Sequence, residues 1–99
     1  MAAPFIRRDS EDAVSKIAVL GAGEMGHGIA ELAAIHGYEV SIRDIRQDFV
    51  DRGMERIGWS LDKLVEHKKL GRDQADAVRK RIHPTLDLAA AVSDADFVV

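Results

Sequence analysis

The chain has 99 residues and a formal net charge of −3, from 17 acidic and 14 basic side chains, and it contains no cysteine. This length suits one small domain, while the mixed charge argues against a nucleic-acid partner recognised through net charge. The lack of cysteine excludes disulfides and thiolate sites and is compatible with the cytoplasm, where we expect the protein; no apolar run could span a membrane, so we expect no membrane partner.

Residues 1–14 are expected to form a loose N-terminal arm, because this segment lacks a signal-peptide core and carries too many acids for a typical transit peptide. One domain is expected over residues 15–99. It opens with Lys16 to Leu20, a nearly continuous apolar run closed by Gly21. Such a run is typical of a strand buried on both faces of a parallel sheet.

The next segment predicts a helix and a second strand. Apolar positions recur at three- and four-residue steps, and the expected inward face is Met25, Ile29, Leu32, Ala33 and His36. Gly37 follows where a left-handed C-terminal cap would fall. Residues 39–43 predict the second strand, so the segment is a βαβ unit, whose crossover is expected to be right-handed.

A long helical pattern follows the second strand. Its expected inward stripe is Phe49, Val50, Met54, Ile57, Leu61, Leu64 and Val65. Gly53 and Gly58 should weaken this helix locally, and Gly71 should end it. Residues 73–81 predict a shorter helix. Its inward residues are expected to be Ala75, Val78 and Ile82.

The last third of the chain predicts short elements. Residues 81–83 fit a minimal third strand, which should lie at an edge or end at Pro84, because proline cannot donate to a ladder. Residues 87–92 predict a short helix, residues 93–96 a turn, and residues 97–99 the opening of a fourth strand. A chain that stops inside a strand is expected to be a fragment of a longer one.

This order of elements predicts the α/β class: a Rossmann-type doubly wound parallel sheet, incomplete, with a helical pair inserted between strands 2 and 3. The expected strand order is 3-2-1-4. The topological switch point then falls between the first and fourth strands. We expect a ligand there, over the loop from Gly21 to Gly26.

That loop has the pattern G-x-G-x-x-G, formed by Gly21, Ala22, Gly23, Glu24, Met25 and Gly26. Gly21 permits a tight turn, Gly23 lets a pyrophosphate approach the backbone, and Gly26 lets the helix pack closely on the strands. Gly28 is expected to extend that contact. The N–H groups and dipole of the helix start would bind the phosphates, and Glu24 is expected to point to solvent, since an inward carboxylate would repel them.

Asp44 follows Gly26 by 18 residues, close to the interval expected for the acid that binds the adenosine ribose. Its carboxylate would repel a 2′-phosphate, so NAD should be preferred over NADP, although Arg43 and Arg46 flank the site. FAD ranks second, because FAD-binding domains usually carry Glu at this position. A P-loop is excluded, since no Gly-Lys-Ser/Thr follows the glycines. The alternative is that Asp44 is an ordinary turn acid.

The chain from about residue 16 to 99 resembles the N-terminal NAD-binding domain of 3-hydroxyacyl-CoA dehydrogenases. The resemblance is carried by IAVLGAGEMGHGIAELAAIHGYEVSIRDI, RGMERIGWSLDKLVEHKKL and RIHPTLDLAAAVSDADFVV. It implies hydride transfer from L-3-hydroxyacyl-CoA to NAD, as in fatty-acid β-oxidation. It also implies that the glycine loop holds the pyrophosphate and that Asp44 binds the ribose.

The resemblance further implies a substrate arm on the long helix. Ser60 matches a family Ser that touches coenzyme A; the matching Lys position holds His67, and Lys68 beside it is the candidate for that role. A solvated helix face is the alternative for both residues. The family's catalytic His and Glu, and the helical domain through which it forms homodimers, lie beyond the matched segment, so no catalytic residue is expected in this chain.

Two alternatives to this function stay open. One is another NAD-dependent dehydrogenase, of the 6-phosphogluconate or opine type; the other is a non-catalytic NAD-binding module. No metal is expected, because the histidines make no ligand pattern. These four residues, interpreted as structural, are His27, His36, His67 and His83.

Overall fold

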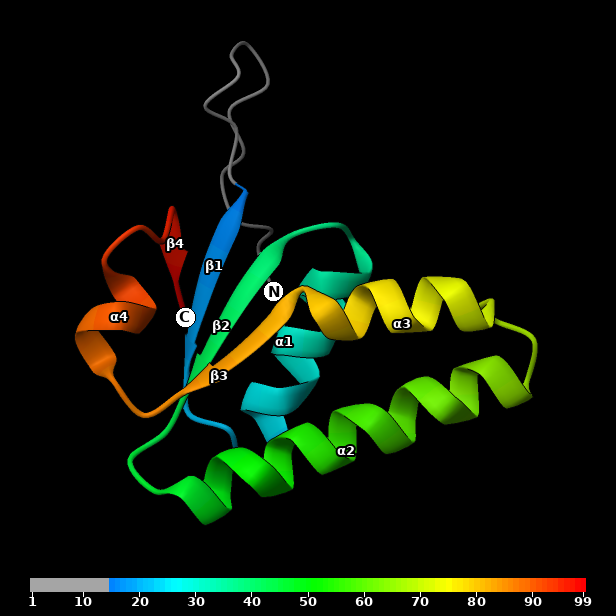
Figure 1. Cartoon of the computed structure of the whole chain (residues 1–99), viewed down its shortest axis with the longest axis horizontal. Coiled ribbons are helices and arrows are strands. Elements are labelled where there is room, and N and C mark those ends of the chain that lie inside the picture. Colours follow the sequence, from blue (N-terminus) through cyan, green and yellow to red (C-terminus); the bar gives the residue numbers. More distant parts are fainter. Residues whose placement is uncertain (1–14) are drawn as a thin grey trace, which may run out of the picture.

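The computed structural model describes residues 15–99, so the arm expected over residues 1–14 lies outside the described part. Strands and helices alternate along the chain, with a helical pair between the second and third strands (Figure 1). The elements are β1 (Lys16–Leu20), α1 (Glu24–Ile35), β2 (Glu39–Arg43), α2 (Gln47–Glu66), α3 (Arg72–Lys80), β3 (Ile82–Thr85), α4 (Leu88–Val92) and β4 (Phe97–Val98).

All the strand pairs are parallel, and the strand order is β3-β2-β1-β4, which confirms the predicted order. In the β1–β2 register Lys16 pairs with Glu39 and Leu20 with Arg43. Figure 1 shows α1, α2 and α3 on one side of the sheet and α4 on the other. Right-handed crossovers require this, because the chain adds β2 and β3 on one side of β1 and then returns to add β4 on the other. The carboxyl ends of β1 and β2 therefore meet at the start of α1.

The core lies between the sheet and the α1–α3 layer. Its largest fully buried side chains are Val19, Val40, Ile42, Val50 and Ile57. Each contributes about 1.5–3 kcal/mol relative to an exposed side chain. The stripe predicted for α2 is confirmed along most of its length: Val50, Ile57 and Leu61 are buried. Met54, Leu64 and Val65 pack against the core. The residues predicted as inward on the shorter helix are buried as well, Ala75 and Val78 on α3 and Ile82 at the start of β3.

The inward face predicted for α1 is partly wrong. Met25 is 80% exposed, Leu32 is 53% exposed and His36 is exposed too, whereas Ala30 and Ala34 are fully buried. The reason is the closeness of α1 to the strands, where a side chain at Gly26 would overlap the Gly21 carbonyl group. The face of α1 in this narrow gap therefore carries small side chains, Ala30 and Ala34, while the predicted Ile29 and Ala33 are partly buried against the core.

The later element ends differ from the predicted ones: α2 ends at Glu66 and not at Gly71, which is instead the N-cap of α3. Gly37 has φ +96° after the end of α1, which confirms the left-handed cap. Strand β3 begins at Ile82 and continues through Pro84, which pairs with Ile42. This is possible because β3 is the edge of the observed sheet and bonds to one neighbour.

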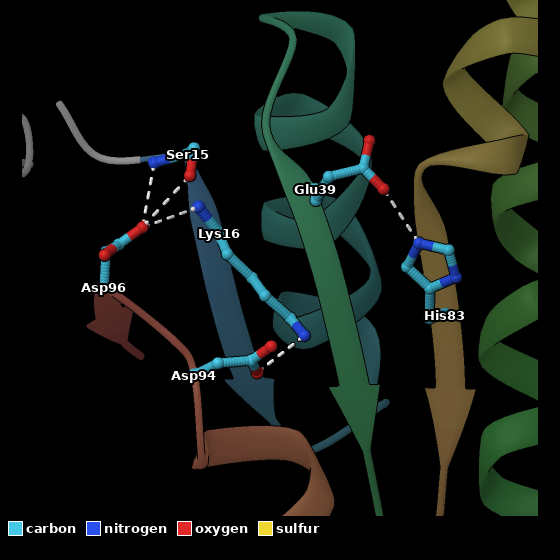
Figure 2. Close-up of polar contacts among 6 residues, drawn as sticks. All are labelled: Ser15, Lys16, Glu39, His83, Asp94 and Asp96. Carbon is cyan, nitrogen blue, oxygen red and sulfur yellow. Dashed lines mark hydrogen bonds and ion pairs between the residues drawn. The ribbon is translucent and has the colours of Figure 1, made fainter. Parts of the chain in front are cut away.

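Side-chain contacts join the amino ends of the strands, opposite the glycine loop (Figure 2). Asp96 Oδ2 accepts hydrogen bonds from the backbone N–H groups of Ser15 at 3.0 Å and Lys16 at 3.1 Å. These bonds hold the pKa of Asp96 below its usual value. The Lys16 ammonium group lies 2.7 Å from Asp94 and lowers the pKa of that carboxyl too. The carboxylates thus attach β4 to the start of β1.

Candidate cofactor site

The glycine loop has the geometry that its sequence predicts. Gly21 has φ +120°, a conformation that favours glycine, and its N–H donates to the Arg43 carbonyl at 2.6 Å. At Gly23 a Cβ would meet no atom within 4 Å, so the loop backbone is open to a ligand. Gly26 has no such space, as its contact with Gly21 shows. The expectation for Gly28 is wrong, because this residue is exposed and a Cβ there would also meet nothing.

Helix α1 begins directly over this loop. Gly23 is its N-cap and has no side chain to bond the first amide groups, which leaves their N–H donors for an anion. The His27 ring lies beside the loop, with Nδ1 2.8 Å from the Gly23 carbonyl oxygen. The Glu24 side chain lies outside what the structure describes, so its orientation stays a prediction.

Asp44 lies at the carboxyl end of β2 and binds the loop itself. Its Oδ2 accepts a hydrogen bond from the Ala22 N–H at 2.8 Å, and its Oδ1 accepts one from the Ile45 N–H at 2.7 Å. A carboxylate oxygen has two lone pairs, so each oxygen keeps one for a further donor such as a ribose hydroxyl. Asp44 therefore holds the loop, a role that the sequence did not indicate, and its binding of a ribose stays a prediction.

A cavity of about 370 Å³ lies between the loop and the first turns of α2. Its lining residues are Ala22, Gly23, Asp44, Phe49, Arg52, Gly53 and Arg56. Gly53, which was expected only to weaken α2, allows this approach: a Cβ there would lie 2.8 Å from the Ala22 carbonyl oxygen. Arg52 and Arg56 were not identified from the sequence, although their spacing places them on one helical face with Phe49.

The two arginines expected to flank the ribose site are bound elsewhere. The Arg43 Nε donates to the Leu86 carbonyl at 3.1 Å. Arg46 makes two hydrogen bonds to Asp48, at 2.9 and 3.1 Å, and its guanidinium lies 4.9 Å from the centre of the Phe49 ring. Neither arginine lines the cavity that Asp44 lines.

Ser60 and Lys68 occupy different environments. Ser60 is half-buried on α2 and donates its hydroxyl proton to Glu31 on α1, with Oγ 2.7 Å from Oε2. Lys68 is exposed beyond the end of α2 and has φ +58°. The expected structural roles of two histidines agree with their contacts: His36 caps α1, and His83 lies 2.9 Å from Glu39.

Within residues 15–99, no group of three or more His, Cys, Asp or Glu side chains is placed to hold a metal ion. No helix in this part of the chain is both long and apolar enough to cross a membrane.

Comparison with known proteins identifies the family. The family model described as "3-hydroxyacyl-CoA dehydrogenase, NAD binding domain" matches residues 16–99. A probable 3-hydroxybutyryl-CoA dehydrogenase of Deinococcus radiodurans is 48% identical over 84 residues, which are 85% of this chain and 30% of that protein. The 3-hydroxyadipyl-CoA dehydrogenase of Escherichia coli is 37% identical over 87% of this chain and 18% of its own length.

Solved structures agree. FadB2 of M. tuberculosis has a TM-score of 0.84 and 34% identity, covering 88% of this chain and 30% of that one. The 3-hydroxybutyryl-CoA dehydrogenase of E. coli has a TM-score of 0.82 and 38% identity, covering 86% of this chain and 18% of that one. The chain thus spans less than a third of the length of these relatives. The match to the family model, together with the loop and its acid, shows that the chain belongs to the 3-hydroxyacyl-CoA dehydrogenase family and carries its NAD-binding domain, with NAD as the cofactor.

Proposed function

We propose that this chain is the NAD-binding part of an enzyme that transfers a hydride from an L-3-hydroxyacyl-CoA to NAD. One observation carries the proposal: Asp44 is bound to the backbone of the open glycine loop, and both face one cavity. This arrangement supports an anion site at the loop with a ribose acid beside it. A dinucleotide needs both within one site.

The residues present fit NAD in three places. The loop at Gly23 has the free space that a diphosphate needs. Asp44 keeps lone pairs for the two hydroxyls of the adenosine ribose. The cavity beyond it offers the Phe49 ring to an adenine base. When bound, NAD supplies the hydride acceptor; the residues described here bind and orient it.

The same geometry favours NAD over NADP. A 2′-phosphate would lie against the Asp44 carboxylate, and like charges repel. Arg43 and Arg46 are held by other partners and do not line the cavity. Arg52 and Arg56 also line this cavity, but Asp44 is the charged residue that is bonded to the glycine loop itself, so we expect its carboxylate to decide the preference.

The substrate part of the proposal concerns the arm formed by α2 and the turn after it. Ser60 and Lys68 are its candidate contacts with the coenzyme A portion, as the family resemblance implies. We also propose that the whole enzyme is cytoplasmic, forms a homodimer through its other domain and has no nucleic-acid partner. The family's catalytic His and Glu lie beyond the matched segment, so we expect this chain to bind ligands without turnover.

Calorimetric titration of the chain with NAD and NADP tests the cofactor part. We expect NAD to bind more tightly than NADP. Asp44→Ala should weaken NAD binding by about tenfold to a hundredfold, the range for hydrogen bonds to a charged group. The matched control is Asp51→Ala, which removes an exposed acid that bonds to Gln47 outside the cavity lining.

Equal affinities for NAD and NADP, or unchanged NAD binding in Asp44→Ala, would contradict the proposed role of the carboxylate. Titration with coenzyme A tests the substrate part separately. A chain that binds NAD but not coenzyme A would instead favour a non-catalytic NAD-binding module.

A further inference from the structure

Glu31 is the buried charged group that the cofactor site does not use. Its side chain is 8% exposed, and it is the only charged side chain among the described residues that is buried. It lies on α1, where Ser60 of α2 donates a hydrogen bond to its Oε2 at 2.7 Å. Burying a carboxylate is costly unless it has a hydrogen-bond partner, so this contact matters to both groups.

The contact also restricts what Ser60 can offer to a ligand. A serine hydroxyl has one proton and two lone pairs. The distance of 2.7 Å falls at the upper end of the range for a charge-assisted O–H···O⁻ bond, which is about twice as strong as a neutral one. While the Ser60 hydroxyl donates its hydrogen bond to Glu31, the half-buried Ser60 oxygen can offer a ligand only its lone pairs.

We propose that Glu31 is a positioning residue: its carboxylate accepts the hydrogen bond of the Ser60 hydroxyl, so that the Ser60 oxygen recognises a hydrogen-bond donor of the coenzyme A ligand and not a phosphate oxygen. This inference rests on the proposed function, which brings Ser60 to the substrate. Coenzyme A offers donors in its amide N–H groups, its hydroxyls and its adenine amino group. Its phosphate oxygens only accept, so an ionised Glu31 selects between these two classes.

The surroundings of Glu31 make its charge state responsive. Burial raises the pKa of Glu31, while the hydrogen bond from Ser60 and the charge of His27 act in the opposite direction. His27 lies one turn earlier on α1. Arg81, the C-cap of α3, reaches the same helix and donates to the Ala34 carbonyl at 2.7 Å. If Glu31 became protonated, the Ser60 hydroxyl could instead donate its hydrogen bond to an acceptor of the ligand.

The test is an NMR titration of the Glu31 carboxyl carbon in the 99-residue chain and in Ser60→Ala, each with and without saturating coenzyme A. Without ligand, the substitution should raise the pKa of Glu31, because the hydrogen bond that lowers it is lost. The negative charge of coenzyme A should raise this pKa in both proteins. A donor bound to Ser60 favours ionised Glu31, so the rise should be smaller in the wild type.

The same samples give the affinities. Ser60→Ala should bind coenzyme A about threefold to tenfold more weakly, the loss of one neutral hydrogen bond. Glu31→Gln leaves an amide that can either accept from or donate to Ser60. We expect this variant to abolish the pH dependence of coenzyme A binding that the wild type shows across the Glu31 titration. Dispersed amide spectra establish that each variant is folded; if Ser60→Ala is not, Ser60→Cys, a weak donor of similar shape, replaces it.

The outcomes separate the two proposals. If the substitution leaves the Glu31 titration of the free chain unchanged, the Glu31–Ser60 bond is overturned whatever coenzyme A does. If the rise with coenzyme A is equal or larger in the wild type, the donor assignment is overturned while the proposed function stands. If the folded chain does not bind coenzyme A, the substrate part of the proposed function fails, and the ligand assignment at Ser60 fails with it.

Discussion

Two helical glycines should respond in opposite ways to substitution by alanine. Gly53 lies on α2 against the loop, where a Cβ would be 2.8 Å from the Ala22 carbonyl oxygen and 3.0 Å from its Cβ. Gly28 lies on α1, is exposed, and has nothing within 4 Å of a Cβ. In a helix interior, alanine is favoured over glycine by about 1 kcal/mol. At Gly53 this gain is offset by overpacking, which costs typically about 1–3 kcal/mol.

We therefore expect Gly28→Ala to stabilise the domain by about 0.5–1 kcal/mol and Gly53→Ala to destabilise it by up to about 2 kcal/mol. Urea unfolding followed by circular dichroism measures both, and for a domain of this size 1 kcal/mol corresponds to a Tm change of about 4–8 °C. Gly53→Ala should also weaken NAD binding, because the loop must move. If it stabilises the domain as much as Gly28→Ala and leaves NAD affinity unchanged, the close approach of α2 to the loop is wrong.

Three further predictions follow from particular contacts. Gly26→Ala should destabilise the domain by about 3 kcal/mol, since its Cβ would overlap the Gly21 carbonyl; a normal urea midpoint would contradict this. Because the pKa of Asp96 is lowered in the folded state, the stability from its bonds is present above its usual value of 3.8 and is lost as the pH falls through the lowered value; Asp96→Asn should reduce that dependence in unfolding measured between pH 2 and 6. Glu31 has the opposite sign: its pKa is raised, so its contribution is present below the usual value of 4.5 and is lost as the pH rises through the raised one. Glu31→Gln should reduce the change in the free energy of unfolding with pH between the usual and the raised pKa of Glu31. An unchanged dependence of stability on pH in either variant would contradict these assignments.

Much of the fold was predictable because it is encoded locally. The bounds of β1 and β2 agree with the predicted ranges, since short apolar runs closed by a turn residue mark strands clearly. The glycine loop is also encoded by neighbouring residues. Its turn requires φ +120° at Gly21, and the glycine at this position in the pattern predicts such a turn. The strand order followed from the alternation of elements and the handedness of their crossovers.

The sequence by itself therefore determined the elements, their order and the glycine loop at the start of α1. The tertiary structure alone decided which side chains meet across packed helices. The inward face of α1 depends on how narrowly it packs on the sheet, and the Glu31–Ser60 bond joins residues 29 positions apart on two helices. Such contacts depend on interhelical distance and side-chain volume, which hydrophobic periodicity does not record; periodicity indicates that a face is covered, and packing determines what covers it.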